Sequence, residues 1–318
     1  MSQPTPAASK PGGLPPADEA FSLLSDSHRI EILRAIWEAT DPLDPAAVPF
    51  TDIRDRVEID DPGQLNYHLN RLAAHFIRRT PNGYVLRESG RRIFRVLISG
   101  TAINDPSIDP VEIDANCVFC GAPTLLSYED GWRYLECTDC DAQCVNSYPD
   151  GVLSRHELPP SGVVDRTPDE IHEADLVWSH HRRASVIDGI CPDCSGPMPV
   201  VSLEVCDDHH PSPDYDEVCE SCGSIFWTEV INMCDICNSV WKMPIQFHLA
   251  THPEVVAFYH EHGIDSHLAT YEHRSSLLEY QEEMLSEDPL RIQTTIPLED
   301  DELHVIVDEQ VNVIGVEQ

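Results

Sequence analysis

Paired cysteines constrain this 318-residue chain more than any other feature. All twelve cysteines lie after residue 116, and ten of them form five C-x-x-C pairs. Secreted proteins use such cysteines in disulfides, whereas a reducing cytosol keeps thiols free to bind metal. C-x-x-C pairs at workable spacing are typical of structural zinc sites. We therefore expect about three structural zinc ions rather than a disulfide framework.

The first four cysteines have the spacing of a zinc ribbon. Two C-x-x-C pairs flank sixteen residues, in which "TLLSYE" and "WRYLE" predict strands joined by a turn at Asp130-Gly131. This hairpin would bring both pairs together, within a ribbon spanning residues 112–158, as a tetrahedral thiolate site. Cys144 lies outside the pattern and is expected to be a packed thiol. The predicted zinc ligands are Cys117, Cys120, Cys137 and Cys140.

The segment 191–237 carries four further ligand pairs, whose partners are open to several interpretations. They are Cys191/Cys194, Cys206/His209, Cys219/Cys222 and Cys234/Cys237. Between them, "PMPVVSLEV" and "SIFWTEVINM" each resemble one strand, and such a length spans about 30 Å, too far for one ion. If the strands form an antiparallel hairpin, the outer pairs share one zinc and the inner pairs another. We favour this nested pairing; sequential and interleaved pairings, and His210 in place of His209, remain alternatives.

Apolar spacing in residues 17–104 predicts four helices, a hairpin and a final helix. Ser25 or Ser27 is the expected N-cap of the second helix, Thr51 that of the third, and Asp61 begins the fourth. Asn82-Gly83 predicts the hairpin turn. This order is that of a winged helix-turn-helix, with the hairpin as the wing.

Three stretches of this region carry a family resemblance. "LLSDSHRIEILRAI", "GQLNYHLNRL" and "GYVLRESGRRI" resemble the ArsR-type winged helix-turn-helix transcription regulators, in the version common in haloarchaea. The resemblance implies a homodimer whose fourth helix enters the major groove of double-stranded DNA. Asn and Gln suit adenine edges and Arg suits guanine, while wing residues would meet phosphates. Carried over by position, the DNA-facing residues are Gln64, Asn66, Tyr67, Asn70 and Arg71 on the helix, and Arg78, Arg79, Asn82 and Tyr84 on the wing.

The chain departs from this family in one respect. Metal-sensing members place cysteines in the winged helix, and this sequence has none before Cys117. Only His28, His68 and His75 remain there, and we expect them to be packed rather than metal-bound. No metal-sensing site is therefore expected in this region.

The charge is strongly acidic and unevenly distributed. The chain has 20 basic and 56 acidic residues, a net charge of −36, and its only lysines are Lys10 and Lys242. Such a surface favours a protein adapted to molar salt, where charge repulsion is screened, over an ordinary acidic protein. Residues 62–104, however, hold seven arginines and one acid, Glu88. This basic island predicts an anionic partner.

The remaining sequence predicts a C-terminal domain, residues 165–318, so the fold class is α+β. "DRTPDEIHEADLVWSHHRRASVIDG" and "HPEVVAFYHEHGID" predict helices. "RIQTTIPL", "ELHVIVDE" and "VNVIGVE" alternate at period two and predict an antiparallel β-meander that turns at Asp300-Asp301.

These features favour a regulator over an enzyme. The sequence contains none of the common catalytic or nucleotide-binding motifs, and four protein ligands leave a zinc ion no position for water. We expect residues 1–16 to form a disordered leader rather than a secretory signal, and we expect a cytoplasmic location without membrane contact.

The expected function is that of a sequence-specific DNA-binding transcription regulator of a halophilic archaeon. Its zinc-stapled C-terminal region would serve dimerisation, signal input or contact with the transcription machinery. The alternatives are a zinc-ribbon protein-interaction adaptor and a redox or zinc sensor.

Overall fold

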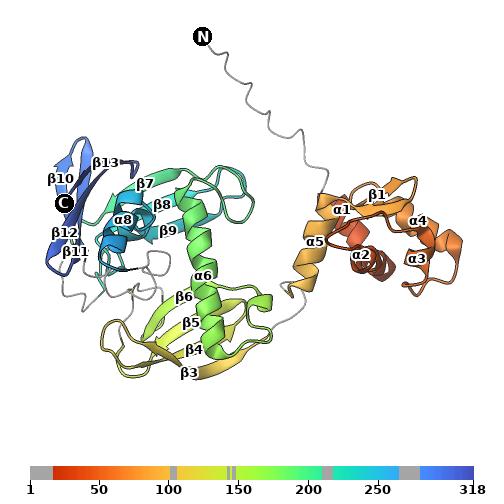
Figure 1. Ribbon diagram of the computed structural model, residues 1–318, viewed down its shortest axis with the longest axis horizontal. Coiled ribbons are helices and arrows are strands. Elements are labelled where there is room, and N and C mark those ends of the chain that lie inside the picture. Colours follow the sequence, from red (N-terminus) through yellow and green to blue (C-terminus); the bar gives the residue numbers. More distant parts are fainter. Residues whose placement is uncertain (1–16, 101–105, 142–143, 145–147, 210–217, 265–279) are drawn as a thin grey trace, which may run out of the picture. The chain divides into compact units, whose positions relative to one another are not determined.

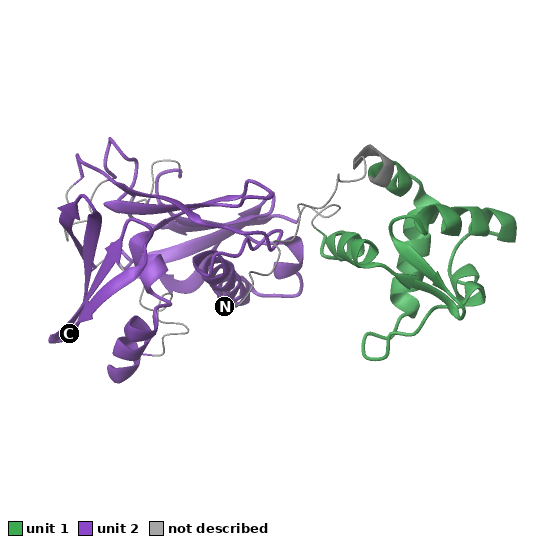
Figure 2. Ribbon diagram, turned by 90° about the horizontal axis from the view of Figure 1, so that it is seen from above, with its two compact units in different colours: residues 1–104 green, residues 105–318 purple. Residues whose placement is uncertain are grey.

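The computed structural model describes residues 17–100, 106–141, 144, 148–209, 218–264 and 280–318 (Figure 1). The chain divides into two compact units, residues 1–104 and residues 105–318 (Figure 2). The fold is mixed α+β with several antiparallel sheets, in agreement with the predicted class. No helix in the described ranges is both long and apolar enough to cross a membrane.

The N-terminal unit contains helices and one hairpin. In chain order these are α1 (Ala17–Leu24), α2 (Ser27–Ala39), α3 (Phe50–Arg54), α4 (Pro62–Leu72), β1 (Ile77–Thr80), β2 (Gly83–Leu86) and α5 (Glu88–Ile98). Asp61 caps α4 as predicted. The other two predicted caps are wrong, because Asp26 caps α2 through the His28 N–H group and Pro49 precedes α3, which contains Thr51.

One apolar core holds this unit together. Leu65, Leu69 and Leu72 of α4 are fully buried, which confirms the predicted stripe, and they join residues of every other helix and of the hairpin in a single cluster. The hairpin packs closely, since Tyr84 exchanges two backbone hydrogen bonds with Val48. Gly83 has a φ of 140°, and a Cβ there would lie 2.1 Å from the Val48 carbonyl oxygen, so only glycine fits.

The C-terminal unit begins with a four-stranded antiparallel sheet. Its order is β3 (Ile108–Asn116), β4 (Pro123–Glu129), β5 (Trp132–Cys137) and β6 (Val152–Glu157). The β4–β5 hairpin turns at Asp130-Gly131 as predicted, and both residues have positive φ. The outer strands β3 and β6 were not predicted.

Helix α6 (Pro168–Ile187) follows a short 3-10 turn (Pro160–Gly162) and connects this sheet with the next one (Figure 1). Near the middle of the helix, the buried carboxylate of Asp175 pairs with Arg133 of β5. Closer to its C-terminal end, the Arg182 guanidinium lies 5.3 Å from the Trp241 ring centroid. The helix therefore fixes the two sheets to one another through charged side chains.

The second sheet contains β7 (Val200–Val205), β8 (Thr228–Met233) and β9 (Val240–Pro244), all antiparallel. Strands β7 and β8 form the hairpin predicted for the nested pairing, with Val200 opposite Asn232 and Val205 opposite Thr228. Strand β9 was not predicted.

The chain ends in two short helices and a third sheet. They are α7 (Ile245–Leu249), α8 (Pro253–Glu261), β10 (Gln281–Glu287), β11 (Leu290–Leu298), β12 (Asp301–Asp308) and β13 (Val313–Glu317). The meander has one strand more than predicted. It turns at Glu299–Asp300 rather than at Asp300-Asp301, because Leu298 pairs with Asp301.

Candidate metal centres and nucleic-acid interface

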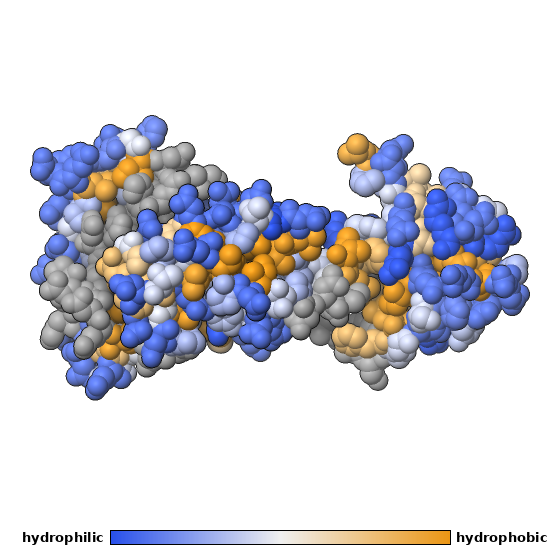
Figure 3. Space-filling model, turned by 90° about the horizontal axis from the view of Figure 1, so that it is seen from below, coloured by the Kyte–Doolittle hydropathy of each residue, from blue (hydrophilic) through white to orange (hydrophobic). Residues whose placement is uncertain are grey.

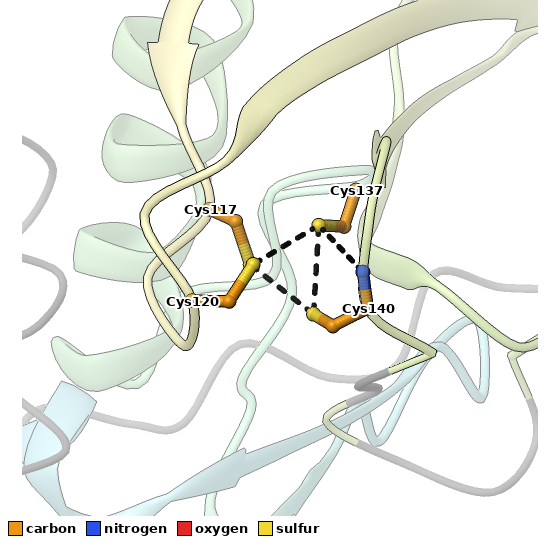
Figure 4. Close-up of side chains that lie close together, drawn as sticks. All are labelled: Cys117, Cys120, Cys137 and Cys140. Atoms are coloured by element: carbon orange, nitrogen blue, oxygen red, sulfur yellow. Dashed lines mark hydrogen bonds between the residues drawn. The ribbon is translucent and has the colours of Figure 1, made fainter.

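The four cysteines of the ribbon converge at one end of the β4–β5 hairpin, as Figure 4 shows. Cys117 and Cys120 come from the turn after β3, Cys137 ends β5, and Cys140 follows it. The Sγ–Sγ distances are 3.7 Å between Cys117 and Cys140 and 3.5 Å between Cys120 and Cys137. The hairpin thus brings together all four predicted ligands.

These distances discriminate between a disulfide and a metal. A disulfide joins sulfurs about 2.05 Å apart. A tetrahedral zinc ion with Zn–S bonds of about 2.3 Å separates its sulfurs by about 3.8 Å. All twelve cysteines are free thiols. The arrangement therefore fits a four-thiolate metal site such as zinc uses.

The outer pairs of the second region form an equivalent tetrad. Cys191 and Cys194 lie before β7, and Cys234 and Cys237 lie between β8 and β9. The Sγ atoms of Cys191 and Cys237 are 3.6 Å apart, and those of Cys194 and Cys234 are 3.5 Å apart. Pairs that are 40 residues apart in sequence thus meet at the open end of the hairpin.

The inner pairs meet at the other end of the same hairpin. Cys206 and Cys219 have Sγ atoms 3.9 Å apart, and the Cys222 Sγ lies 3.6 Å from Nδ1 of His209. His210, the alternative ligand, lies outside the described residues. The structure therefore groups the pairs in nested order, not sequentially, and three cysteine clusters could hold metal ions such as zinc.

Four of the C-x-x-C pairs share one backbone conformation. In each, the first cysteine donates its N–H to the carbonyl five residues later and accepts from the N–H four residues later, all at 2.8 to 3.1 Å. The residue after the second cysteine has a left-handed φ of 58° to 75°, which suits glycine and asparagine. These residues are Gly121, Ser195, Gly223 and Asn238.

This conformation points backbone N–H groups at sulfur. The N–H groups of Gly196 and Ile236 lie 3.4 Å from the Sγ atoms of Cys194 and Cys234. The backbone N–H groups of Cys237 and Ile236 lower the pKa of the Cys234 thiol to about 7. Such donors favour the thiolate, which is the form that binds metal.

Cys144 is a packed, half-buried thiol, as predicted. Its Sγ donates to the Leu153 carbonyl at 3.4 Å. Its own carbonyl accepts the Ile225 N–H at 3.0 Å, which connects the ribbon with the inner cluster.

The candidate DNA-facing residues lie mostly where the sequence predicted. At 100° per residue, the predicted face of α4 is opposite its buried leucines. The wing residues Arg78, Arg79 and Asn82 are also exposed. The predicted residues of α4 are all exposed, and they are Gln64, Asn66, Tyr67, Asn70 and Arg71.

Tyr84 is a correction to this set. Its residue is only 5% exposed, and it packs in the apolar core of the N-terminal unit. Strand alternation places Tyr84 and Leu86 on the buried face of β2, so the side chain of Tyr84 points into the core. The ring therefore cannot meet a phosphate group.

Two histidines that were expected to pack separately lie together. His28 and His68 share a cluster with Asp26, in which one possible ligand atom from each residue lies within 4.8 Å of the others. His75 lies apart from this cluster, half-buried beside Phe76. The sequence signal for this cluster was the Asp-x-His pattern at the start of α2. The third residue of the cluster, His68, follows His28 by 40 residues and lies on another helix.

Comparison with protein families gives two matches. Residues 114–313 match the family described as a domain of unknown function, DUF7351. This match covers well over half of the chain, so the chain belongs to that family. Residues 17–97 match a second domain of unknown function, DUF7347. No curated protein and no solved structure matches the chain.

Proposed function

We propose that this DUF7351 protein is a sequence-specific DNA-binding transcription regulator. Its N-terminal unit would act as a winged helix-turn-helix, with α3 and α4 as the helix pair and β1–β2 as the wing. Its C-terminal unit would be held by three structural zinc ions. The protein would act in the cytoplasm as a homodimer, and the homodimer is what the resemblance to ArsR-type regulators implies.

Unpaired guanidinium groups are the observation that carries this proposal. Arg71 of α4 and Arg78 and Arg79 of β1 are exposed, and their guanidinium groups form no hydrogen bond or ion pair with the described parts of the chain. In a chain of net charge −36, three arginines left without acidic partners favour an external anion. Phosphate groups and guanine edges are the anionic and acceptor groups that arginine binds in DNA.

The arginines of α5 behave differently and narrow the proposed interface. Arg91 and Arg92 pair with Glu88, and Arg87 donates to the Ile77 carbonyl at 2.9 Å. Arg95 lies 6.0 Å from the Trp37 ring centroid. The arginines of the basic island thus fall into two groups. Those of α5 have partners within the protein, whereas the side chains of those on α4 and β1 have none among the described residues.

The exposed face of α4 has the chemistry of a base-reading helix. Gln64, Asn66 and Asn70 present side-chain amides, which can form paired hydrogen bonds with adenine. Tyr67 is 60% exposed, a large fraction for an aromatic ring on a helix with a buried opposite face. These groups are of the kind that reads base edges in the major groove.

The cysteine clusters support a structural role for the C-terminal unit. Each has four candidate protein ligands, counting His209, so a bound ion has no open position for a reacting water. Zinc would supply folding free energy to these segments.

DNA binding by matched variants tests the proposal. The operator is first selected from random duplexes, and affinity for it and for a scrambled duplex is measured by anisotropy in about 2 M KCl, where phosphate contacts are largely screened. Asn70→Ala or Arg71→Ala should lose about 1–3 kcal/mol of discrimination between the two duplexes. Arg79→Ala should weaken binding to both duplexes alike, slightly in about 2 M KCl and more strongly as the salt is lowered, because a phosphate contact carries no sequence information.

Arg92→Ala is the matched control, since Arg92 is exposed on α5 but paired with Glu88. It should leave both affinities unchanged. If wild-type protein does not discriminate between the duplexes, the proposal fails. If Arg71→Ala and Arg79→Ala act identically, α4 is not the reading helix.

One observation favours a protein-interaction adaptor as a second candidate. Figure 3 shows apolar residues gathered in a band on one face of the C-terminal unit. On α6, Val177 and Trp178 are 47% and 42% exposed and line a shallow hollow of about 690 Å³. Genome-wide DNA occupancy separates the two functions, because discrete peaks over one motif favour the regulator and their absence favours the adaptor.

A further inference from the structure

We propose that Asp26, His28 and His68 form a binding site for one divalent transition-metal ion in the N-terminal unit, with zinc as the representative ion. The site joins the start of α2 to α4. It is separate from the three cysteine clusters, which all lie in the C-terminal unit.

The spacing of the three side chains fits one ion. Nδ1 of His28 lies 3.5 Å from Oδ1 of Asp26, and Nδ1 of His68 lies 3.7 Å from Oδ2 of the same carboxylate. Tetrahedral ligands at zinc bond lengths of about 2.0–2.1 Å are separated by about 3.4 Å. The two separations involve different oxygens of the carboxylate. One ligand atom from each of the three residues lies within 4.8 Å of the others, so the side chains need to move closer by at most about 1.4 Å to hold one ion.

The same distances do not fit direct hydrogen bonds. An N–H···O hydrogen bond has a nitrogen–oxygen distance of about 2.7–3.2 Å. The Asp26 carboxylate therefore lies near both imidazoles and bonds to neither ring. The rings are stacked, with centroids 5.4 Å apart and planes inclined by 29°. The carboxylate forms a hydrogen bond with neither ring, so the ring nitrogens near it are available to coordinate an ion.

His68 provides a second, independent indication of a ligand. The residue is only 4% exposed, and its Nδ1 is buried with no hydrogen-bond partner. A buried polar atom without a partner costs about 1–3 kcal/mol and calls for an explanation. Coordination of an ion would satisfy this nitrogen.

The carboxylate is held in place by the residues around it. Asp26 caps α2 by accepting the His28 N–H at 3.0 Å on Oδ1. Arg29 donates to Oδ2 at 3.4 Å. Metal ligands are commonly oriented by such hydrogen bonds, and an ionised carboxylate has lone pairs left to coordinate an ion.

The donor set predicts the kind of ion and its behaviour. Two imidazole nitrogens and one carboxylate oxygen suit zinc, nickel or cobalt better than calcium or magnesium. Three protein ligands leave a fourth position to water, so the ion would exchange more readily than in a closed four-thiolate site. Such a site is suited to reporting metal availability.

The position of the site suggests what the ion would influence. Tyr67, the exposed neighbour of His68 on α4, lies edge-on to the His68 ring at 5.2 Å between centroids. An ion that ties His68 to the start of α2 would fix α4 against α2. Metal binding itself is independent of the proposed function, whereas an effect on DNA affinity rests on it.

Calorimetric titration of Zn²⁺ into the full chain tests the site. Protein is first desalted without chelator, so that closed thiolate sites keep their metal while the open site empties. Wild-type protein should show one further binding event. His28→Ala should weaken it about tenfold or more, and so should Asp26→Asn, which keeps the helix cap because asparagine caps as well as aspartate.

His75→Ala is the matched control and should bind as wild type does. His68→Gln, which preserves bulk in the core, should also lose the event while circular dichroism shows a folded protein. Absence of the event in wild-type protein would overturn the proposal, and so would an event unchanged in both His28→Ala and Asp26→Asn. Operator affinity with and without Zn²⁺ is measured separately. A protein that binds Zn²⁺ here but no DNA would refute the proposed function alone.

Discussion

The two units of this protein are stabilised in different ways. The N-terminal unit buries sixteen apolar residues in one continuous cluster, drawn from all its helices and its hairpin. The C-terminal unit is about twice as long but divides its buried apolar residues among three separate clusters. All three cysteine clusters lie in this second unit, whose individual cores are smaller.

The two units also differ in charge. Residues 106–318 contain 42 acidic and 8 basic residues, whereas residues 1–105 contain 14 and 12. Apolar area is limited in small modules, and repulsion among carboxylates opposes compaction further. Metal cross-links supply stability that does not depend on apolar area. Acid-rich modules can therefore remain folded with small cores where the N-terminal unit needs a large one.

Metal removal should produce the largest difference in stability between the two units. Chelation of about three zinc ions should unfold residues 112–245 and leave the N-terminal unit folded, because a structural zinc contributes about 10–16 kcal/mol of apparent binding free energy in small domains. Elemental analysis gives the stoichiometry, and hydrogen exchange by mass spectrometry locates the unfolding. About one zinc per chain, or protection of β7 and β8 that persists after chelation, would contradict this comparison.

Serine substitutions should show which cysteines of the C-terminal unit share one zinc ion. Cys206→Ser and Cys219→Ser should each lose one zinc, and the double variant should lose only the same one, because both belong to the inner cluster. Cys206→Ser combined with Cys234→Ser should lose two. Cys144→Ser should lose none. If Cys206→Ser and Cys191→Ser removed a common ion instead, the nested assignment would be wrong.

A cavity in the N-terminal core should lower the stability of that unit without removing zinc from the cysteine clusters. Leu69→Ala removes a fully buried side chain and should lower the free energy of unfolding of that unit by about 2–5 kcal/mol. The zinc held by the three cysteine clusters should stay at the wild-type value. Thermal melting and elemental analysis of desalted protein, in which the proposed site at His68 is empty, check both expectations, and loss of cysteine-bound zinc in this variant would show that the units depend on each other.

A smaller effect concerns acid sensitivity of the ribbon. Burial lowers the pKa of His156 to about 4 from its ordinary 6.5, although Asp175 opposes this. The unfolded chain therefore binds more protons between these values, so stability contributed by the neutral imidazole is present above pH 6.5 and is lost as pH falls towards 4.

Between about pH 7 and about pH 4.5, wild-type protein should lose about 1–3 kcal/mol more than His156→Gln. Denaturant unfolding of both proteins provides the measurement, and the shared effect of acid on thiolates cancels in their difference. Parallel losses would show that His156 is protonated as readily in the folded state as in the unfolded one.

Much of this structure could be predicted where the signal is local or regularly spaced. The α4 stripe, the Asp61 cap and the Asp130-Gly131 turn follow from periodicity and from residues with strong conformational preferences. The nested cysteine grouping followed from a length argument, since one continuous strand cannot bring its own ends together. The stripe, the cap and the turn depend only on neighbouring residues, and the cysteine grouping depends only on the lengths of the two strands between the pairs.

The remaining features depend on packing between segments that are far apart in sequence. Strands β3 and β6 border an already recognised hairpin, and β10 carries a buried glutamate, Glu282, that disguises its alternation. The exposure predicted for Tyr84 was wrong because Tyr84 lies on the face of β2 that packs against the helices in the apolar core. The meeting of His28 with His68 could not be read from either helix alone.

The nested hairpin also has a consequence for the order in which metal is acquired. Cys206 and Cys219 are 13 residues apart in sequence, whereas Cys194 and Cys234 are 40 apart. In a disordered chain, closing the longer loop costs about 1 kcal/mol more in entropy than closing the shorter one. Once the inner ligands meet, pairing of β7 with β8 carries the outer ligands towards each other. The inner site should therefore form first and the outer site second. A newly made chain that receives too little zinc should accumulate with the inner site filled and the outer site open.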